Sequence, residues 1–334
     1  MLSRVADSLY WLSRYVERAE NTARVLDVQL DLSIDLHHLS RKEIWQQWES
    51  IVIAMGEEQN FNHSGLAHTA QGVAEFLAFQ PSNPNSILTC IRYARENARS
   101  VREQISSEMW EHLNSLFLSV KNMDSSKMWK EGPHRFFKEI KGAAQNFHGI
   151  TDATMTHSEG WEFIRVGKFL ERADKTTRLL DVRHHLLQSD ANRVSRLTDS
   201  LEWVAVLKSC SAFEAYRKAF NSSIEPQKIV QFLILHDAFP RSTQFSISQV
   251  ADALRNITPV TQGQFVNTAQ KTAGRLRADF AFWDINDIFN PGLHQFLDAL
   301  QLRFNHLADA ISQCYLSHSQ AYPDEVEMTI QQQQ

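Results

Sequence analysis

The stretch Tyr15–Val28, with the sequence YVERAENTARVLDV, returns as Phe169–Val182 with the sequence FLERADKTTRLLDV. Eight of the fourteen positions are identical, and the two stretches lie 154 residues apart. A repeat that only fills a hydrophobic core would preserve its apolar spacing first, whereas this one also preserves charge. The repeated charges are Glu17 and Glu171, Arg18 and Arg172, Arg24 and Arg178, and Asp27 and Asp181. These side chains are therefore the first candidates for a functional site.

Two further markers extend the repeat. Phe76–Ser86 aligns with Phe232–Ser242 at a displacement of 156 residues, and Trp48 aligns with Trp203 at a displacement of 155. A period this long exceeds the roughly 20–50 residues of solenoid repeats. The repeated unit is therefore expected to be the size of half a domain or more.

These markers predict a single domain over residues 1–317. Its two repeats span about 1–156 and 157–317, and a pseudo-two-fold axis relates the two halves. The remaining residues, 318–334, include a polar stretch that ends in four glutamines. They are expected to form a disordered tail.

Composition and periodicity predict an all-α fold. The 334 residues include only 11 Gly and 8 Pro, which favours long helices with short connections over many tight turns. Apolar residues recur with a helical period over residues 3–38, and no long run of alternating β-branched residues occurs. We expect an internally duplicated helical bundle of roughly ten to twelve helices with almost no sheet. Three helices are expected to begin at Pro84, Pro240 and Pro291, because proline is favoured at the first helical position. Others are expected over residues 41–55 and, as one continuous helix, over 195–220.

Charge and cysteine content exclude several classes of protein. The formal net charge of −5 gives no reason to expect nucleic-acid binding. Three widely spaced cysteines fit reduced thiols better than a disulfide framework. The N-terminus lacks a secretory h-region, and no apolar run is long enough to span a membrane. We therefore expect a cytoplasmic protein that does not contact a membrane.

The first candidate site is a charged stripe on the first helix. Its members, three to four residues apart, are Arg14, Glu17, Arg18 and Asn21, with Arg24 at the edge. The second half offers Arg165, Lys168, Glu171, Arg172 and Arg178. Three interpretations stay open: a solvated face with weak ion pairs, a buried Glu–Arg network between the halves, and a cleft for an anionic or amino-acid-like ligand.

Two more constellations are candidates. The helix over residues 92–103 carries charges of alternating sign, which is typical of a solvent-exposed face but also fits a ligand or partner contact. Its candidate residues are Arg95, Glu96, Asn97 and Arg99. The two expected helix starts near Asn85 and Arg241, each followed by a serine (Ser86 and Ser242), could hold an anion at free N–H groups, although such serines usually satisfy only local donors.

The familiar catalytic patterns are missing from the sequence. It contains no glycine-rich phosphate loop, no His-Glu-x-x-His and no Cys-x-x-Cys. The 14 histidines are scattered, so no metal site is expected, and Cys210 is expected to be a buried structural thiol.

The sequence resembles the bacterial alpha-E domain family over nearly its whole length. The stretches that carry the resemblance are Tyr10–Arg24, Ala94–Glu103, Trp110–Asn114, Gly167–Asp174 and Phe239–Ser242. The resemblance implies a circularly permuted ATP-grasp protein as partner, a possible link to a transglutaminase-like peptidase system, and a role in amide-bond formation. ATP and Mg²⁺ would then bind only to the ATP-grasp partner. The family motifs carry over to Arg14, Glu17, Arg18, Asn21, Arg24, Arg95, Glu96, Asn97, Arg99, Glu171, Arg172, Arg241 and Ser242. One departure is Lys168, which stands where the first half has Arg14.

Two functional hypotheses follow. In the first, the chain is the helical partner of an ATP-dependent amide ligase: arginines hold a carboxylate or phosphate, and Glu17 or Glu171 orients an amine or acts as a base. In the second, the chain is a non-catalytic interaction scaffold whose charged stripes are structural. An independent hydrolase lacks any nucleophile or metal signature. Burial discriminates between the first two, because a binding stripe faces an open cleft whereas a structural one is dry and fully paired.

Overall fold

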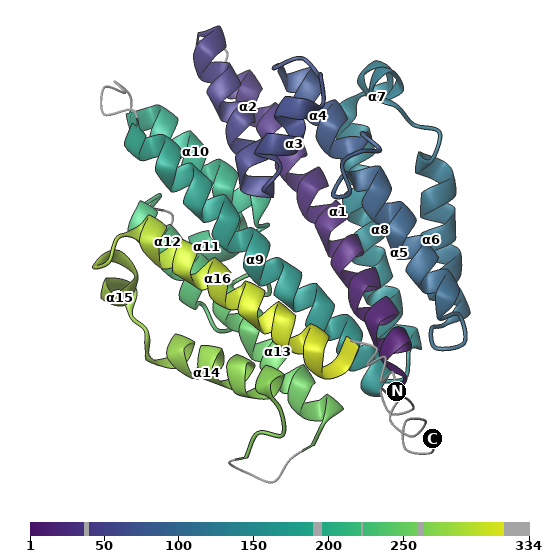
Figure 1. The fold of residues 1–334 in the computed structure, drawn as a ribbon. Coiled ribbons are helices and arrows are strands. Elements are labelled where there is room, and N and C mark those ends of the chain that lie inside the picture. The colour runs from purple at the N-terminus through teal and green to yellow at the C-terminus, as the bar shows by residue number, and fades with distance from the viewer. Residues whose placement is uncertain (37–39, 190–195, 222, 260–263, 317–334) are drawn as a thin grey trace, which may run out of the picture.

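The computed structural model describes residues 1–36, 40–189, 196–221, 223–259 and 264–316 (Figure 1). These residues form 16 α-helices and no strand, which confirms the all-α class. The helices are α1 (Ser3–Asp35), α2 (Arg41–Met55), α3 (Glu58–His63), α4 (Ala70–Ala78), α5 (Ile87–Ser100), α6 (Ser107–Val120), α7 (Ser125–Glu131), α8 (Pro133–Thr154), α9 (Glu159–Ser189), α10 (Arg196–Ser209), α11 (Phe213–Ala219), α12 (Pro226–Leu235), α13 (Thr243–Ile257), α14 (Thr268–Phe282), α15 (Ile285–Phe289) and α16 (Leu293–Ile311). A π-helical turn over Ser312–Leu316 follows α16. The expected tail at 318–334 lies outside the described residues.

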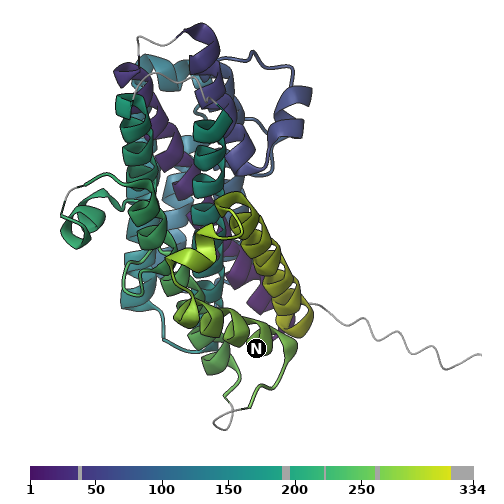
Figure 2. The same ribbon diagram turned by 90° about the vertical axis from the view of Figure 1, so that its left-hand side faces the viewer.

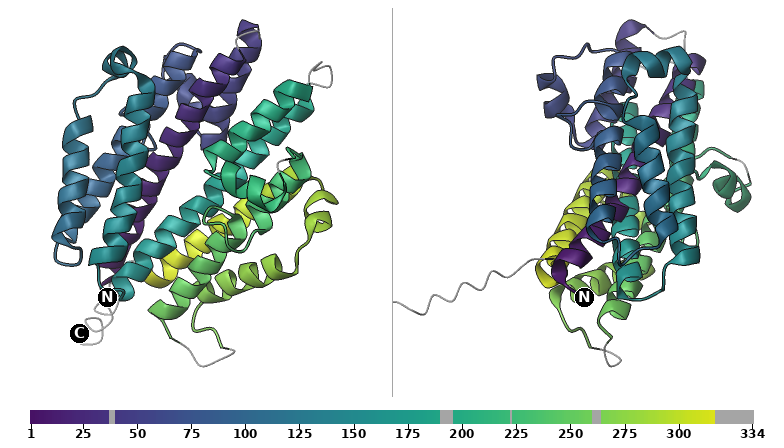
Figure 3. Two further views of the ribbon diagram at one scale, coloured as in Figure 1. Left: turned by 180° about the vertical axis from the view of Figure 1, so that it is seen from behind. Right: turned by 90° about the vertical axis from the view of Figure 1, so that its right-hand side faces the viewer.

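Two long helices, α1 and α9, run side by side through the middle of the molecule (Figure 1). Helices α4 to α8 gather on the side of α1, and α11 to α16 gather on the side of α9 (Figures 2 and 3). Helices α2 and α10 cross over: α2 packs chiefly against α9, and α10 packs chiefly against α1. Each central helix packs against several neighbours, α1 against α5 and α8, and α9 against α13 and α16. The division into two repeats and their internal duplication stay predictions.

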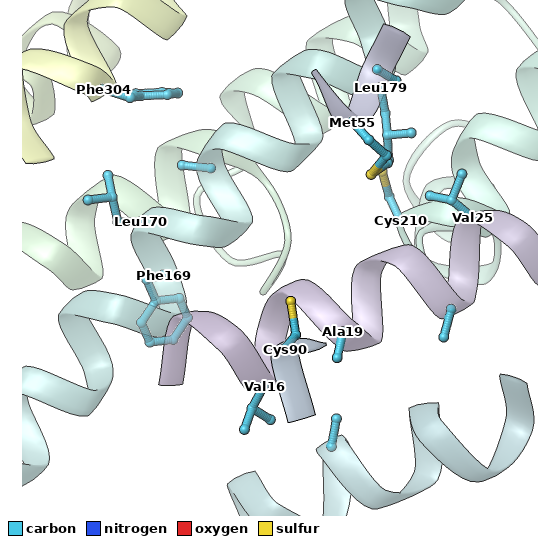
Figure 4. Close-up of a cluster of buried hydrophobic side chains, with 14 of the residues drawn as sticks. Val16, Ala19, Val25, Met55, Cys90, Phe169, Leu170, Leu179, Cys210 and Phe304 are labelled. Carbon is cyan, nitrogen blue, oxygen red and sulfur yellow. The ribbon is translucent and has the colours of Figure 1, made fainter. Parts of the chain in front are cut away.

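The contact between α1 and α9 depends on a glycine. A Cβ atom at Gly167 would lie 2.3 Å from the carbonyl oxygen of Tyr10 and 2.2 Å from Oγ of Ser13. No side chain fits this space, so glycine lets the two backbones approach closely. Apolar side chains surround the crossing, among them Val16 and Ala19 of α1 and Phe169 and Leu170 of α9 (Figure 4).

The helix number exceeds the ten to twelve predicted, chiefly because short helices were missed. Helices α3, α7 and α15 have only 6, 7 and 5 residues, too few for a periodic pattern to be recognised. The single helix expected over 195–220 is instead α10 and α11. The break lies at Ser211, whose φ of 50° is incompatible with a continuing helix. The guanidinium of Arg24 in α1 hydrogen-bonds to Oγ of Ser211, so a tertiary contact accompanies the break.

The three predicted proline starts were wrong. Helices α5 and α13 begin after Ser86 and Ser242, whose hydroxyls accept hydrogen bonds from backbone N–H groups three residues later. Helix α16 begins after Gly292, at a φ of 97°. A serine or glycine cap outweighed the preference of proline for the first turn, and the prolines lie in the preceding turns.

No described helix is both long and apolar enough to cross a membrane. The cysteines are unpaired thiols: Cys90 and Cys210 are buried, and Cys314 is exposed. Burial raises the pKa of Cys90 to about 12 and that of Cys210 to about 11. The structure thus confirms Cys210 as a buried thiol, and both buried cysteines stay protonated at neutral pH.

Candidate functional site

The two Glu-Arg dipeptides of the repeat pair with each other across the α1–α9 contact. Nε of Arg172 donates to Oε1 of Glu17 at 2.8 Å. In the reverse direction, Nε and Nη2 of Arg18 donate to the two carboxylate oxygens of Glu171 at 2.7 and 3.0 Å. Both glutamates are 0% exposed. The geometry is that of a buried Glu–Arg network between the two central helices.

The surroundings of Glu17 are closed. Nη1 of Arg241 donates to Glu17 at 2.6 Å, and its Nη2 donates to Glu20 at 2.5 Å. Nε2 of His148 lies 3.1 Å from the second oxygen of Glu17. Arg24 pairs with Glu20 from the next turn of α1. The carboxylates here are thus held by several buried donors.

The surroundings of Glu171 are open on one side. Nε of Arg14 donates to Glu171 at 2.8 Å, and Arg14 also donates to the hydroxyl of Tyr10 at 2.8 Å. Arg18 reaches past Glu171 to the side-chain oxygen of Asn85. Beside these groups lies a cleft of about 280 Å³ between α1, α2, α9 and α16. Its lining includes Arg14, Arg18, Glu57, Lys175, Arg178 and Phe304.

Lys175 is the most unusual group of the cleft. It is 8% exposed, and its ammonium makes no hydrogen bond within the described part of the chain. The carboxylate in ion-pair range is that of Asp174, with Oδ2 3.9 Å from Nζ. Burial lowers the pKa of Lys175, although Glu171 and Asp174 raise it in part. A largely buried ammonium whose ion-pair partner is as distant as 3.9 Å is poorly compensated, and an anionic ligand in the cleft would improve the compensation.

Arg178 and Arg14 also have donors to spare. Nε of Arg178 donates to both oxygens of Asp174 at 2.9 Å, which leaves its terminal nitrogens without a hydrogen bond among the residues described. Nη2 of Arg14 is likewise unengaged there. The cleft therefore presents unused donors from three cations, and guanidinium groups are suited to bind carboxylate or phosphate.

The two glutamates are firmly ionised. Burial raises the pKa of Glu17, but Arg172 and Arg241 outweigh it and hold that pKa well below its usual value. For Glu171, burial again raises the pKa, and Arg18 and Arg14 hold it far below the usual range. A general base needs a pKa near the working pH. Their surroundings therefore favour a role for both as anchors of arginines, and a role as bases stays a prediction without structural support.

The other predicted residues are dispersed. On α5, Arg95 donates to Asn114 at 2.8 Å and to Glu96 at 2.6 Å, and Glu96 also pairs with Arg99. None of these, nor Asn97, lines the cleft. Ser242 caps α13, and its hydroxyl donates to the carbonyl of His236. Asn21 accepts from Arg241 at 3.4 Å, within the closed network.

Sequence reasoning missed three charged groups that line the cleft, Glu57, Asp174 and Lys175, whereas Asn85 belongs to one of the two helix starts considered for an anion. Asp174 and Lys175 lie inside the quoted repeat, where they replace Glu20 and Asn21. Attention to where the two copies differ would have found them. Glu57 follows the C-terminus of α2 and carries no motif, so no sequence signal pointed to it. No cluster of metal-ligating side chains occurs among the residues that the structure places.

Comparisons with known proteins extend this picture. A family called Alpha-E, described as a predicted alpha-helical domain with a conserved ER motif, matches residues 1–316. In one-letter code ER is Glu-Arg, and the chain contains this dipeptide twice, at Glu17-Arg18 and Glu171-Arg172. Proteins of Mycobacterium bovis and of Mycobacterium tuberculosis, each described as uncharacterized, are 22% identical over 275 residues. The alignments cover 76% of this chain but 30% of those relatives' length. No solved structure matches.

Proposed function

The chain belongs to the Alpha-E family, and we propose that it is the helical partner of an ATP-grasp amide-bond-forming system. In this role it binds an anionic, amino-acid- or peptide-like ligand in the cleft beside Glu171. The observation that carries the proposal is Lys175, an 8% exposed residue of the cleft lining whose ammonium makes no hydrogen bond in the described chain and has an ion-pair partner, Asp174, only at 3.9 Å. A charge held in this way lowers stability unless a ligand of opposite sign completes it.

The proposed division of work assigns activation to the partner. The ATP-grasp protein, with ATP and Mg²⁺, converts a carboxylic acid to an acyl phosphate, whose carbonyl carbon an amine attacks while phosphate leaves. The present chain holds the carboxylate of one component through Lys175, Arg178 and Arg14. Fixing a reactant in the correct orientation lowers the barrier of such a step substantially. Glu17 and Glu171 keep the arginines in place.

Two further observations support a system of several parts. The Mycobacterium relatives are much longer than the aligned region, so in those proteins the helical region is joined to other segments of chain. We also infer that the two halves arose by duplication, because the Glu-Arg dipeptides pair reciprocally, Glu17 with Arg172 and Glu171 with Arg18. A link to a transglutaminase-like peptidase system stays part of the proposal.

The alternative is a non-catalytic interaction scaffold. The closed surroundings of Glu17 favour it, because there Arg172, Arg241 and His148 occupy the carboxylate completely. In this case the second network would be structural as well, and the cleft would be an unused gap.

Reconstitution with a circularly permuted ATP-grasp protein as partner tests the proposal. ADP release is measured over a panel of amino acids and dipeptides, with the wild-type chain, with Lys175→Met, and with Lys168→Met as control. Lys168 is a partly buried lysine of the same helix that does not line the cleft. We expect ADP release to need both proteins and to fall at least tenfold only with Lys175→Met. If the two proteins form a stable complex but ADP release is the same with and without this chain, the chain is a scaffold instead.

A further inference from the structure

Glu57 places a second uncompensated charge in the same cleft. Its side chain is 2% exposed and lines the cleft directly after the C-terminus of α2. Oε1 accepts a hydrogen bond from the amide of Asn85 at 2.5 Å, and Oε2 accepts one from the amide of Asn60 at 2.7 Å. No lysine or arginine of the described chain forms an ion pair with it. Two amides orient this carboxylate without neutralising it.

Glu57 lies at the junction between α2 and α3. Helix α2 ends at Gly56, which adopts the left-handed conformation with a φ of 77°. The backbone N–H groups of Gly56 and Glu57 donate to the carbonyls of Ile53 and Val52, and Glu57 is also the N-cap of α3. The negative charge at this position therefore comes from the carboxylate of Glu57 itself, which is suited to bind an ammonium group.

The same cleft also offers cationic donors. Lys175, Arg178 and Arg14 line it, each with a nitrogen that makes no hydrogen bond within the described chain. Lys175 does not pair with Glu57; its ion-pair partner is Asp174, whose Oδ2 lies 3.9 Å from Nζ. Burial of charged groups is tolerated only where they are compensated. One ligand that carries both an anion and a cation would bring a close partner to Lys175 and to Glu57.

The size of the cleft limits that ligand. Pockets for drug-sized ligands measure about 300–1,000 Å³. The present cleft, at about 280 Å³, lies just below that range, and Lys175, Arg178 and Glu57 all line it. A ligand that reaches both Lys175 and Glu57 is therefore small, with its two charged groups close together.

We propose that the cleft binds a single free amino acid as a zwitterion, with its carboxylate at Lys175 and Arg178 and its ammonium group at Glu57. The binding mode stands on the two buried charges alone. That the bound molecule is the amine component of the amide bond rests on the function proposed above. Asn85 joins the two subsites, because it accepts from Arg18 and donates to Glu57.

Calorimetry on the full chain tests this inference without the ATP-grasp partner. Each probe is compared with the analogue that lacks one charge: glutamate with glutarate, which lacks the amine, and alanine with ethylamine, which lacks the carboxylate. The variants are Glu57→Gln, which keeps the shape of the side chain, and Lys175→Met. Glu103→Gln and Lys168→Met are the controls, since neither lines this cleft. Circular dichroism confirms that each variant is folded.

We expect at least one amino acid of the panel to bind, and its analogues to bind at least tenfold more weakly. Glu57→Gln should weaken amino-acid binding roughly ten- to hundredfold, as the loss of a charged hydrogen bond does, and leave glutarate unaffected. Equal affinity for glutarate and glutamate, unchanged by Glu57→Gln, would overturn the zwitterion site but keep an anion site and hence the proposed function. Failure of every probe to bind would overturn the zwitterion site, while ADP release in the reconstituted system would still decide the function.

Discussion

Glu17 and Glu171 belong to identical Glu-Arg dipeptides on the two central helices, but different side chains surround them. At Glu17, Arg241 fills the space beside the pair and bonds to Glu17 and Glu20. At Glu171, the aligned residue is Asn85, which is shorter and bonds to Arg18 and Glu57 instead. One exchange of arginine for asparagine thus accompanies the difference between a closed network and an open cleft.

A second residue difference between the two copies also distinguishes the closed network from the cleft. Asn21 of the closed network corresponds to Lys175 of the cleft in the quoted repeat. On the closed side the carboxylates of Glu17 and Glu20 bind several guanidinium groups directly, although Nδ2 of Asn21 and Nε of Arg24 lack a hydrogen bond. In the cleft, Lys175 makes no hydrogen bond in the described chain and has Asp174 as an ion-pair partner at 3.9 Å. The comparison teaches that an identical Glu-Arg motif can be a structural tie or part of a binding site, depending on the neighbours that tertiary packing supplies.

The largest expected effect is the loss of Glu17. Glu17→Ala leaves Arg172 and Arg241 buried without their carboxylate, so the free energy of unfolding should fall by about 3–5 kcal/mol. Urea denaturation measures it. Glu96→Ala, which removes a partly exposed ion pair on α5, should stay within about 1 kcal/mol of the wild type. A loss below 1 kcal/mol for Glu17→Ala would show that the closed network is not a structural tie.

The lowered pKa values of Glu17 and Glu171 should make the stability of the protein depend on pH. Their arginine partners hold the pKa of each below its ordinary value of 4.5, so the folded state releases protons that the unfolded state binds. Their contribution is present above pH 4.5 and is lost as the pH falls, at up to about 1.4 kcal/mol per pH unit for each carboxylate. Denaturation curves between pH 7 and 3 measure the slope. Glu171→Gln should reduce it, and an unchanged slope would contradict the assigned pKa shift.

The close approach of the central helices gives the next effect. Gly167→Ala places a methyl group against the backbone of Tyr10, so both crossed pairs must shift, and stability should fall by about 1–3 kcal/mol. Gly142→Ala in α8 is the control, because a Cβ there meets no atom within 4 Å. That substitution should be stabilising by about 0.5–1 kcal/mol. Equal melting temperatures for Gly167→Ala and Gly142→Ala would contradict the close contact between the two helices.

The smallest effect has the opposite sign. Burial lowers the pKa of Lys175 below its ordinary 10.5, so its charge destabilises the folded state at neutral pH. Lys175→Met should therefore raise the free energy of unfolding of the ligand-free protein by about 1 kcal/mol. The same variant should lose the stabilisation that a bound amino acid gives, whereas Lys168→Met should keep it. If Lys175→Met instead lowers the free energy of unfolding and the variant is still stabilised by the amino acid, Lys175 has a structural role and does not bind the ligand.

Much of the local structure was predictable. The residues 41–55 were expected as a helix, and α2 has those bounds, because Ser40 and Glu43 form a capping box and Gly56 ends the helix. The start of α1 near Ser3 was also expected. The pairing of the repeated charges was only one of three interpretations that the sequence left open. Local signals of capping and period act over a few residues, so a single sequence displays them fully.

The sequence by itself determined an all-α chain, two long charged helices and the Glu-Arg dipeptides as the place to look. Tertiary structure alone decided that Glu17 is closed in and that Glu171 borders a cleft. The contacts responsible join residues far apart in the chain, such as Arg241 to Glu17 and Asn85 to Arg18. Helical period gives the face of a residue but not what covers that face, and whether a buried charge finds a partner depends on that cover.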